Sequence, residues 1–183
     1  MQPSVEPLPD PVRGADATIR DATSADVPAL QALILAHGPN PWNHLPVDEI
    51  RAHVAAIAEG RVDAVVAEAG GAIIAAVTYE TTDAFRRYRP SASPASALGH
   101  VCEAVVHREH AGRSLGSRLL RAAVGHLRRL GCDDIYVERH EQNAASAAMM
   151  ARAGFVAIDT FDDPLRRPNG SGRTTVCRFR SAP

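Results

Sequence analysis

The chain has 183 residues, 45% of them apolar, with 20 basic side chains against 21 acidic ones. This length suits one domain whose core is large enough to fold without disulfides. The nearly balanced charge provides no net field that would hold the protein on nucleic acid or on an anionic membrane. We therefore expect a small-molecule or peptide partner.

The cysteines and the N-terminus point to the cellular setting. Cys102, Cys132 and Cys177 are widely spaced and lack the Cys-x-x-Cys or Cys/His spacing of a metal site. We interpret them as reduced thiols of a cytoplasmic protein and expect no metal. Residues 1–16 have neither the basic start nor the apolar run of a signal peptide, and we expect a disordered proline-rich leader before a single domain at 17–183. No apolar run approaches the roughly 20 residues of a membrane-spanning helix.

The first third of the chain predicts one strand and two helices. A short strand at 17–20 precedes Asp26, a suitable N-cap, and Pro28, which fits the first turn of a helix that continues to residue 37. Glycine and proline interrupt the pattern before a second helix at 47–59, where apolar residues recur at helical spacing.

The middle of the chain predicts a β-hairpin followed by a third strand. Two runs rich in β-branched residues, 62–68 and 72–79, are separated by Gly70-Gly71, a two-residue hairpin turn. A polar stretch at 81–97 then leads to a strand at 98–106. Because long loops in compact domains are often functional, this stretch is a candidate substrate loop.

The second half alternates helices and strands. The pattern at 114–130 is an amphipathic helix with one apolar stripe, and glycine follows it. The remaining predicted elements are a strand at 135–138, a helix at 143–153, a strand at 155–160, a loop at 164–172 and a strand at 174–179. Strands adjacent in sequence at both ends of the chain favour a mixed α+β sheet over a doubly wound one.

The junction at 105–117 carries the clearest chemical signal. A strand passes through a loop of small residues into a helix, and the unpaired amides at a helix start, with the helix dipole, bind phosphate. Gly112 and Gly116 would let the backbone approach an anion, and Arg113 can supply charge. A Walker loop and a Gly-x-Gly-x-x-Gly fingerprint are both absent. Taken alone, the loop fits equally well a plain strand-to-helix turn, which also needs small residues.

Two motifs together resemble the GNAT acetyltransferase superfamily. The first motif is Gln/Arg-x-x-Gly-x-Gly/Ala between a strand and a helix, and residues 111–116 occupy its positions here. The second motif contains an Asn, small and aliphatic residues, and Gly-Phe. Its positions are occupied by Asn143, Ser146, Met149, Met150 and Gly154-Phe155. The resemblance extends over nearly all of residues 17–180. It implies an α+β fold with a mixed, mostly antiparallel central sheet of about seven strands, flanked by about four helices.

The resemblance also implies acetyl-CoA as cosubstrate and transfer to an amine by direct attack in a ternary complex. The residues that would bind the pyrophosphate are Gly112, Arg113, Ser114, Leu115, Gly116 and Ser117. The backbone at Val105 and Val106 would bond the pantetheine and polarise the thioester, and Asn143 would contact the pantetheine. An alternative is a coenzyme A-binding sensor of the same fold that has lost catalysis.

Three positions depart from the family pattern. Ala111 replaces Gln or Arg, and Ser114 replaces a glycine, so Ser114 is expected to avoid positive φ. Met150 stands where many relatives have a tyrosine that is proposed to protonate the leaving thiolate, and a thioether cannot donate a proton. Because a thiol has a pKa near ~8.5, a missing acid is tolerable at neutral pH.

A general base matters more, because an alkyl ammonium acceptor with a pKa near ~10.4 must lose its proton before it attacks. The candidates are Glu103 and His100, on the strand before the loop. Being three residues apart, they would lie on opposite faces of a regular strand, so only one faces the acceptor unless a bulge intervenes.

The resemblance implies that two segments line the acceptor side, and the charge of a third segment makes it a further candidate. Trp42 and His44 lie in the break between the first two helices, and Arg139 and His140 follow the strand at 135–138, where a plain charged surface loop is the alternative. Three arginines near the last hairpin, Arg166, Arg167 and Arg173, could attract an acidic acceptor, or nearby aspartates could neutralise them. Edge strands at that hairpin could pair in a homodimer.

Overall fold

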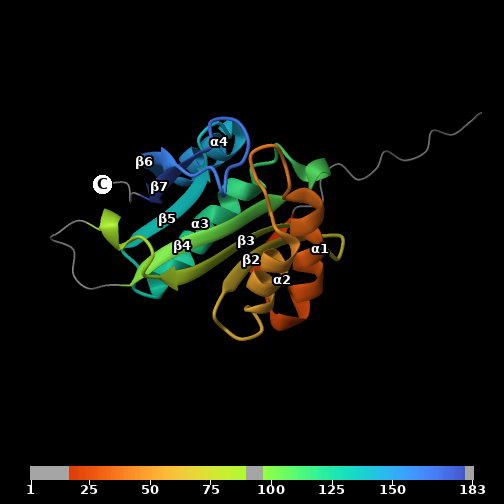
Figure 1. Ribbon diagram of the computed structural model, residues 1–183. Coiled ribbons are helices and arrows are strands. Elements are labelled where there is room, and N and C mark those ends of the chain that lie inside the picture. Colours follow the sequence, from red (N-terminus) through yellow and green to blue (C-terminus); the bar gives the residue numbers. More distant parts are fainter. Residues whose placement is uncertain (1–16, 90–96, 180–183) are drawn as a thin grey trace, which may run out of the picture.

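The computed structural model describes residues 17–89 and 97–179 (Figure 1). The leader expected at 1–16 lies outside these ranges, as do residues 90–96 of the candidate substrate loop. The described strands are β1 (Thr18–Asp21), β2 (Asp63–Ala69), β3 (Ala72–Thr82), β4 (Leu98–Val106), β5 (Asp134–His140), β6 (Phe155–Asp162) and β7 (Arg173–Phe179). The α-helices are α1 (Val27–His37), α2 (Val47–Ala55), α3 (Leu115–Arg129) and α4 (Ala144–Ala153).

The strands form one sheet in the order β1-β2-β3-β4-β5-β7-β6. Only β4 and β5 run parallel among these neighbours, because α3 carries the chain back across the sheet between them. The mixed, mostly antiparallel seven-stranded sheet with four α-helices confirms the predicted fold class.

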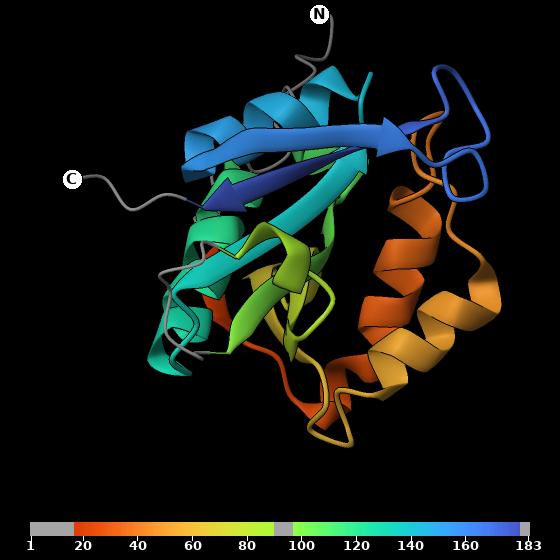
Figure 2. The same ribbon diagram turned by 60° about the vertical axis from the view of Figure 1, so that its left-hand side comes forward.

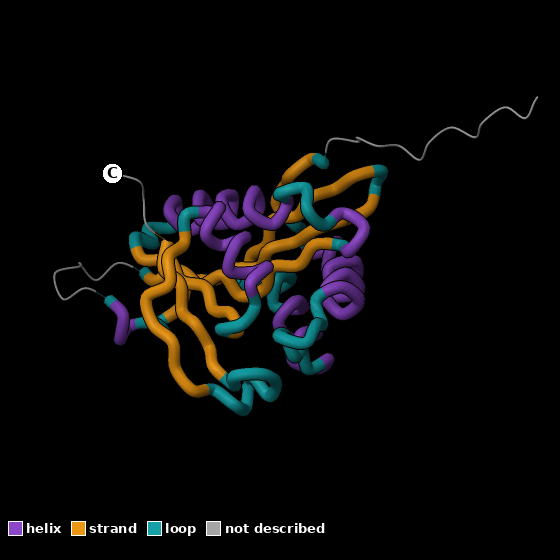
Figure 3. Tube along the Cα trace, turned by 90° about the horizontal axis from the view of Figure 1, so that it is seen from above, coloured by secondary structure: helices purple, strands orange, loops and turns teal. Residues whose placement is uncertain are grey.

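The helices cover both faces of the sheet (Figures 2 and 3). On one face, α1 and α2 bury a cluster that includes Leu30, Ile34 and Val54 against β2 and β3. On the other face, α3 packs on β2, β3 and β4 and also contacts α4. Burying both faces leaves the strand ends and loops to line a site. None of the described helices combines the length and the apolar character that crossing a bilayer requires.

The helix α3 forms where the apolar stripe predicts it. Leu119, Ala123 and Leu127 recur every four residues and are completely buried, and they hold the helix against the sheet. The helix therefore fixes the position of its own N-terminus relative to β4.

The hairpin between β2 and β3 turns at Gly70 and Gly71, which have φ angles of 58° and 77°. Two consecutive residues with positive φ are what a tight hairpin turn of this hand requires, and glycine adopts that conformation without a steric penalty.

Among the element boundaries that differ from the prediction, those of α2 and β5 have clear structural causes. The second helix ends at Ala55 instead of residue 59, because the following amides bond to carbonyls only three residues back and tighten the chain into turns. Strand β5 extends to His140, because Arg139 and His140 pair with Thr175 and Thr174 of β7. Arg139 and His140 are therefore strand residues, and the alternative of a charged surface loop is wrong.

The sheet divides between β4 and β5. Their ladder consists of four residue pairs and ends at Val101 and Val137. Beyond this point β4 continues to Val106 and β5 to His140 without pairing to each other, and the two strands diverge toward α4 and the α1–α2 loop (Figure 1).

Candidate active site

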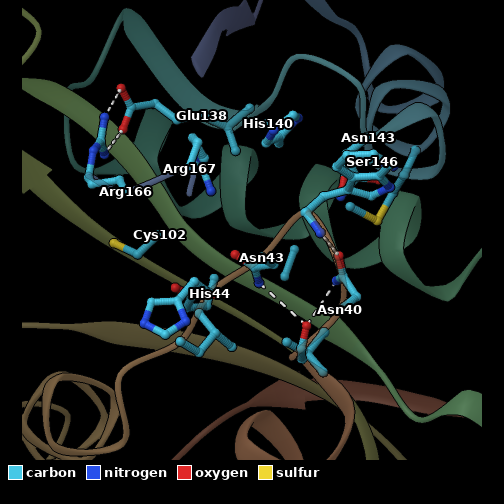
Figure 4. A pocket seen from close by; sticks show the side chains of 18 of the residues that line it. Asn40, Asn43, His44, Cys102, Glu138, His140, Asn143, Ser146, Arg166 and Arg167 are labelled. Atoms are coloured by element: carbon cyan, nitrogen blue, oxygen red, sulfur yellow. Dashed lines mark hydrogen bonds and ion pairs between the residues drawn. The ribbon is translucent and has the colours of Figure 1, made fainter. Parts of the chain in front are cut away.

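A cavity of about 410 Å³ occupies the opening between the diverging strands. Its lining comes from β4, β5, the α1–α2 loop, the start of α4 and the β6–β7 loop (Figure 4). Of the residues predicted from the sequence, the lining contains Trp42, His44, His100, Glu103, Val105, Val106, His140 and Asn143. Segments separated by more than a hundred residues thus meet at one place.

A bulge in β4 brings both candidate bases to this cavity. Thr78 of β3 pairs with Glu103, but Tyr79 pairs with Val101, so Cys102 is an extra residue in β4. The extra residue shifts the alternation of side chains, and His100 and Glu103 both line the cavity. The condition under which both could face the acceptor is therefore met.

The Glu103 carboxyl lies in a desolvated environment. Burial raises the pKa of Glu103 to about 7, and the positive charge of Arg167 opposes the rise. The Glu103 amide donates to Thr78 Oγ1 at 3.1 Å, and Thr78 Oγ1 also lies 2.9 Å from His53 Nε2. This buried network fixes the backbone at the bulge, while no hydrogen bond or ion pair holds the carboxylate within the described ranges. A carboxyl group with a pKa near neutrality suits proton abstraction.

His100 is engaged with neighbouring groups. Its Nδ1 lies 3.6 Å from Glu80 Oε1 and 3.6 Å from Cys102 Sγ. Glu80, His100 and Cys102 each offer a potential ligand atom within 4.8 Å of the others, so this group could hold a metal ion. Because the same imidazole nitrogen faces both partners, the three residues do not form a nucleophilic triad, in which the thiol and the carboxylate would use different nitrogens. Burial also raises the pKa of Cys102, which opposes formation of a thiolate.

Two loops meet across one end of the cavity. Asn169 Nδ2 of the β6–β7 loop donates to the Pro41 carbonyl at 2.9 Å, and the Asn169 carbonyl lies 2.8 Å from His140 Nε2. The Trp42 ring lies against His140, with the centroids 4.9 Å apart. Trp42 thus both lines the cavity and anchors its loop.

Arg139 does not reach this cavity. It is absent from the lining, and its guanidinium donates to the carbonyls of His140 and Glu141 and interacts with Cys177 in the core below α3 and α4. Successive strand residues point to opposite faces, so Glu138 and His140 face the cavity and Arg139 faces away from it. The expectation that Arg139 lines the acceptor site is wrong.

The three arginines near the last hairpin differ in their partners. Arg166 pairs with Glu138 and Asp163, and Arg173 pairs with Glu141 and Asp162. These two are neutralised within the protein. Arg167 also lines the cavity, but no carboxylate lies within ion-pair distance of it in the described part of the chain.

The loop at 112–117 lies at the N-terminus of α3, outside the cavity lining, and adjoins it at Gly116, which faces Met149 and Val106 of the lining. Arg118 N–H makes the first intrahelical bond, to the Ser114 carbonyl, and no side chain caps the preceding amides. The Ser117 hydroxyl is buried without a partner among the described residues. Uncapped amides beside an unsatisfied hydroxyl are polar groups that suit a phosphate-bearing ligand.

Ser114 has the conformation that the sequence led us to exclude. Its φ is 58°, in the left-handed region. Within the described ranges, all other residues with positive φ are glycines. The expectation that Ser114 avoids positive φ is therefore wrong. The turn still requires the left-handed conformation that glycine usually supplies, and the serine adopts it at a steric cost of about 1 to 2 kcal/mol.

The two glycines of this loop have different functions. Gly112 has a φ of 78°, and a Cβ there would meet no atom within 4 Å, so open space surrounds it. A Cβ on Gly116 would instead collide with Met149 Sδ of α4. Gly116 is therefore small so that α3 and α4 can approach, and not to admit an anion.

The start of α4 completes the cavity. Asn143 Oδ1 accepts from the Ser146 amide at 3.0 Å and caps the helix. Met150 is 4% exposed and lines the cavity, so a thioether lies beside the site. The Ser146 hydroxyl is a proton-bearing group of the same helix in the lining.

The family profile described as "Acetyltransferase (GNAT) family" matches residues 27–155. The chain belongs to the GNAT acetyltransferase family. Among solved structures, GNAT relatives match it over most of its length, although no curated protein sequence matches it.

Three solved structures illustrate this similarity. A ribosomal-protein-alanine N-acetyltransferase from Brucella melitensis is 19% identical, with a TM-score of 0.70, and the match covers 90% of this chain and 99% of that one. The yncA protein of Salmonella typhimurium, solved with its cofactor acetyl-CoA, is 22% identical, with a TM-score of 0.66 and coverage of 92% and 98%. The polyamine N-acetyltransferase of Drosophila melanogaster, which forms N-acetylagmatine, is 19% identical, with a TM-score of 0.68 and coverage of 90% and 98%.

Several cavity residues of this GNAT domain had no signal in the sequence. The lining also includes Asn40, Asn43 and Glu49. Asn40 and Asn43 donate to the Gly38 carbonyl and hold the α1–α2 loop in shape (Figure 4). Two asparagines in a loop that also contains glycine and proline are typical of turns in general, so this pattern alone could not mark a site.

Proposed function

We propose that the protein transfers an acetyl group from acetyl-CoA to an amine of a small molecule or peptide, by direct attack within a ternary complex. The observation that carries the proposal is the cavity between the diverging strands, which contains the desolvated Glu103 carboxyl. Membership of the GNAT family supports acetyl transfer in general.

The chain's own groups suit the coenzyme at one end of the opening. We assign the pyrophosphate to the amides of residues 112–117, which are uncapped and adjoin the cavity lining at Met149 and Val106. We assign the pantetheine to the free edge of β4 at Val105 and Val106, with Asn143 on the other side. An extended ligand bonded to a free strand edge satisfies backbone groups that lack a strand partner.

We assign the general base to Glu103. An ammonium group that enters the cavity gives its proton to the Glu103 carboxylate, directly or through a water molecule, and the free amine then attacks the thioester carbonyl. His100 also lines the cavity, but Glu80 and Cys102 already surround its Nδ1. Holding both substrates in one opening supplies several kcal/mol of the acceleration.

The leaving thiolate needs no dedicated acid in this scheme. Met150 cannot donate a proton, but a thiol with a pKa near ~8.5 leaves as thiolate at neutral pH at a cost of roughly 2 kcal/mol. The proposed transfer uses no metal ion, and we place the enzyme in the cytoplasm because of its cysteine spacing.

The test combines binding with turnover. Acetyl-CoA is expected to raise the melting temperature of the purified protein, and a panel of amines is expected to include acceptors that release free thiol above the hydrolysis background. Stabilisation without thiol release from any amine would instead favour a coenzyme A-binding sensor that has lost catalysis. Absence of stabilisation would exclude both.

A further inference from the structure

Arg167 stands apart from the other arginines of the β6–β7 loop. Its Nε donates to Thr174 Oγ1 at 3.0 Å, and Thr174 Oγ1 in turn donates to Asp163 at 2.7 Å. One side of the guanidinium is thus held in place. The side chain points into the cavity (Figure 4), and its Nη groups have no hydrogen-bond partner within residues 17–89 and 97–179.

The surroundings of Arg167 leave its charge incompletely compensated. The side chain is partly buried, and burial together with the neighbouring Arg166 guanidinium lowers the pKa of Arg167. Arg166 and Arg173, by contrast, each contact two carboxylates. Removing a charge from water without a partner is unfavourable, so an anion supplied by a ligand would stabilise this arrangement.

Arg167 also lies close enough to the candidate base for their charges to interact. The positive charge of Arg167 lowers the pKa of Glu103, and the negative charge of Glu103 raises that of Arg167. Both residues line the same cavity, so a molecule whose amine lies at Glu103 can present a second group to Arg167. A planar guanidinium with two free Nη groups matches the two oxygens of a carboxylate.

We propose that the acceptor is an amino acid, whose carboxylate Arg167 binds while its amine faces Glu103. This inference rests on the proposed function and names the substrate class of the same site. Arg167 then acts as a specificity-determining residue, and the α1–α2 loop, which lines the same cavity, borders the side chain of the amino acid.

A simpler role for Arg167 would be to balance the charge of Glu103. In that case substitution of Arg167 would change the rate for all acceptors by the same factor. Binding of a carboxylate predicts a different result, in which acceptors that carry the carboxylate lose more activity than those that lack it.

The experiment compares each common L-amino acid with its primary amide as acceptor. The amide keeps the side chain and the amine but lacks the negative charge, and its amine loses a proton more easily, so a preference for the acid cannot arise from the amine. Wild type is expected to prefer one or more acids over their amides by roughly 10- to 100-fold in kcat/KM. In R167Q the ratio of acid to amide kcat/KM is expected to fall to about 1, whatever change the lost charge beside Glu103 causes in both rates, and R167K is expected to recover part of the preference.

Arg173 provides the matched control. R173Q removes the same charge from the same hairpin, but Arg173 lies outside the cavity lining and is neutralised by Glu141 and Asp162. R173Q is therefore expected to keep the preference for acids. If R167Q retains the preference, if wild type has none, or if R173Q loses it to the same extent as R167Q, the proposal is wrong.

A binding measurement separates this proposal from the proposed function. The same acids are added to the protein saturated with coenzyme A, and the melting temperature is recorded for wild type and R167Q. Stabilisation of wild type but not of R167Q would support the carboxylate site. If no acid were acetylated in addition, the site would stand, but the proposal that amino acids are acetylated would be wrong. Acetylation of amines without any acid-dependent stabilisation would support the transferase and overturn the carboxylate site.

Discussion

Glu103 is a carboxyl group whose chemistry depends on its surroundings. In water its pKa would lie near ~4.3 and it would be a weak base. The bulge at Cys102 turns it into the cavity, and burial raises its pKa to about 7. A carboxylate at this pKa is a stronger base, and about half of the groups are ionised at pH 7.

The first prediction concerns the pH dependence of this residue. E103Q removes the base and is expected to lower kcat/KM by about 10²- to 10⁴-fold. Because the base works when deprotonated and its pKa is about 7, the ratio of wild-type to E103Q activity should rise roughly tenfold from pH 6 to pH 8. Protonation of the acceptor amine affects both proteins equally and cancels in this ratio. A ratio that does not change with pH would remove Glu103 from the role of base.

Ser114 shows a residue under backbone strain. Its φ of 58° is favourable for glycine and costly for a residue with a Cβ. Since backbone amides and not the hydroxyl would hold the ligand, the strain has no evident compensation in the loop's binding function.

The second prediction follows from this strain. S114G is expected to stabilise the protein by up to about 1 kcal/mol, because relief of strain exceeds the entropy that glycine adds to the unfolded chain. In a domain of this size, that change raises Tm by about 2 to 4 °C. S114A keeps the Cβ and serves as the control, with no gain expected. An equal gain in S114A would show that the side chain, and not the backbone, is responsible.

At the scale of elements, the contact between α3 and α4 decides how the two motifs of the family meet. Gly116 in the first turn of α3 packs against Met149 of α4, and Met149 lines the cavity. The glycine therefore couples the proposed pyrophosphate loop to the wall beside the pantetheine.

The third prediction tests this coupling with a double-mutant cycle. G116A is expected to displace Met149, to destabilise the protein by about 1 kcal/mol and to weaken acetyl-CoA binding severalfold. In an M149A background, the space beside residue 116 is free and G116A should have little effect on either quantity. Stability from thermal unfolding and affinity from titration provide the two measurements. Additive effects would mean that the two residues act independently.

The elements differ in how far the sequence determines them. The helix α3 and the glycine turn at 70–71 follow from local patterns, a stripe every four residues and two positions that need positive φ. The bulge at Cys102 and the extension of β5 to His140 depend on strands far away in the chain, β3 and β7. Such pairing leaves no local signal, which is why the charged run at 138–141 resembled a surface loop.

At the scale of the whole molecule, the cavity exists because the sheet divides into two parts. The four-pair ladder of β4 and β5 joins them, and the contact between Asn169 and Pro41 closes the far side. The sequence predicted that Trp42 and His140 belong to the acceptor side, on the basis of family resemblance. It could not predict the bond that joins their loops across 128 positions.

The fourth prediction concerns this bond. N169A removes the donor to the Pro41 carbonyl and leaves the Asn169 carbonyl that faces His140. A net loss of about 1 kcal/mol in loop closure is expected to raise KM for the acceptor roughly fivefold without changing acetyl-CoA affinity. Q31A removes a similar amide-to-carbonyl bond, from Gln31 to Arg51, away from the cavity and is expected to leave both constants unchanged. Weaker acetyl-CoA binding in N169A would contradict the prediction, because it would show that the bond between the two loops also supports the coenzyme site.

The free edge of β4 beyond Val101 has a consequence for turnover. In the assignment proposed above, coenzyme A bonds to this edge through the amides of its pantetheine arm and to the start of α3 through its phosphates. Nearly all of its contacts are then remote from the acyl group, so the product coenzyme A binds almost as tightly as acetyl-CoA. We therefore expect product release to limit turnover, and substitutions that weaken coenzyme binding to increase kcat.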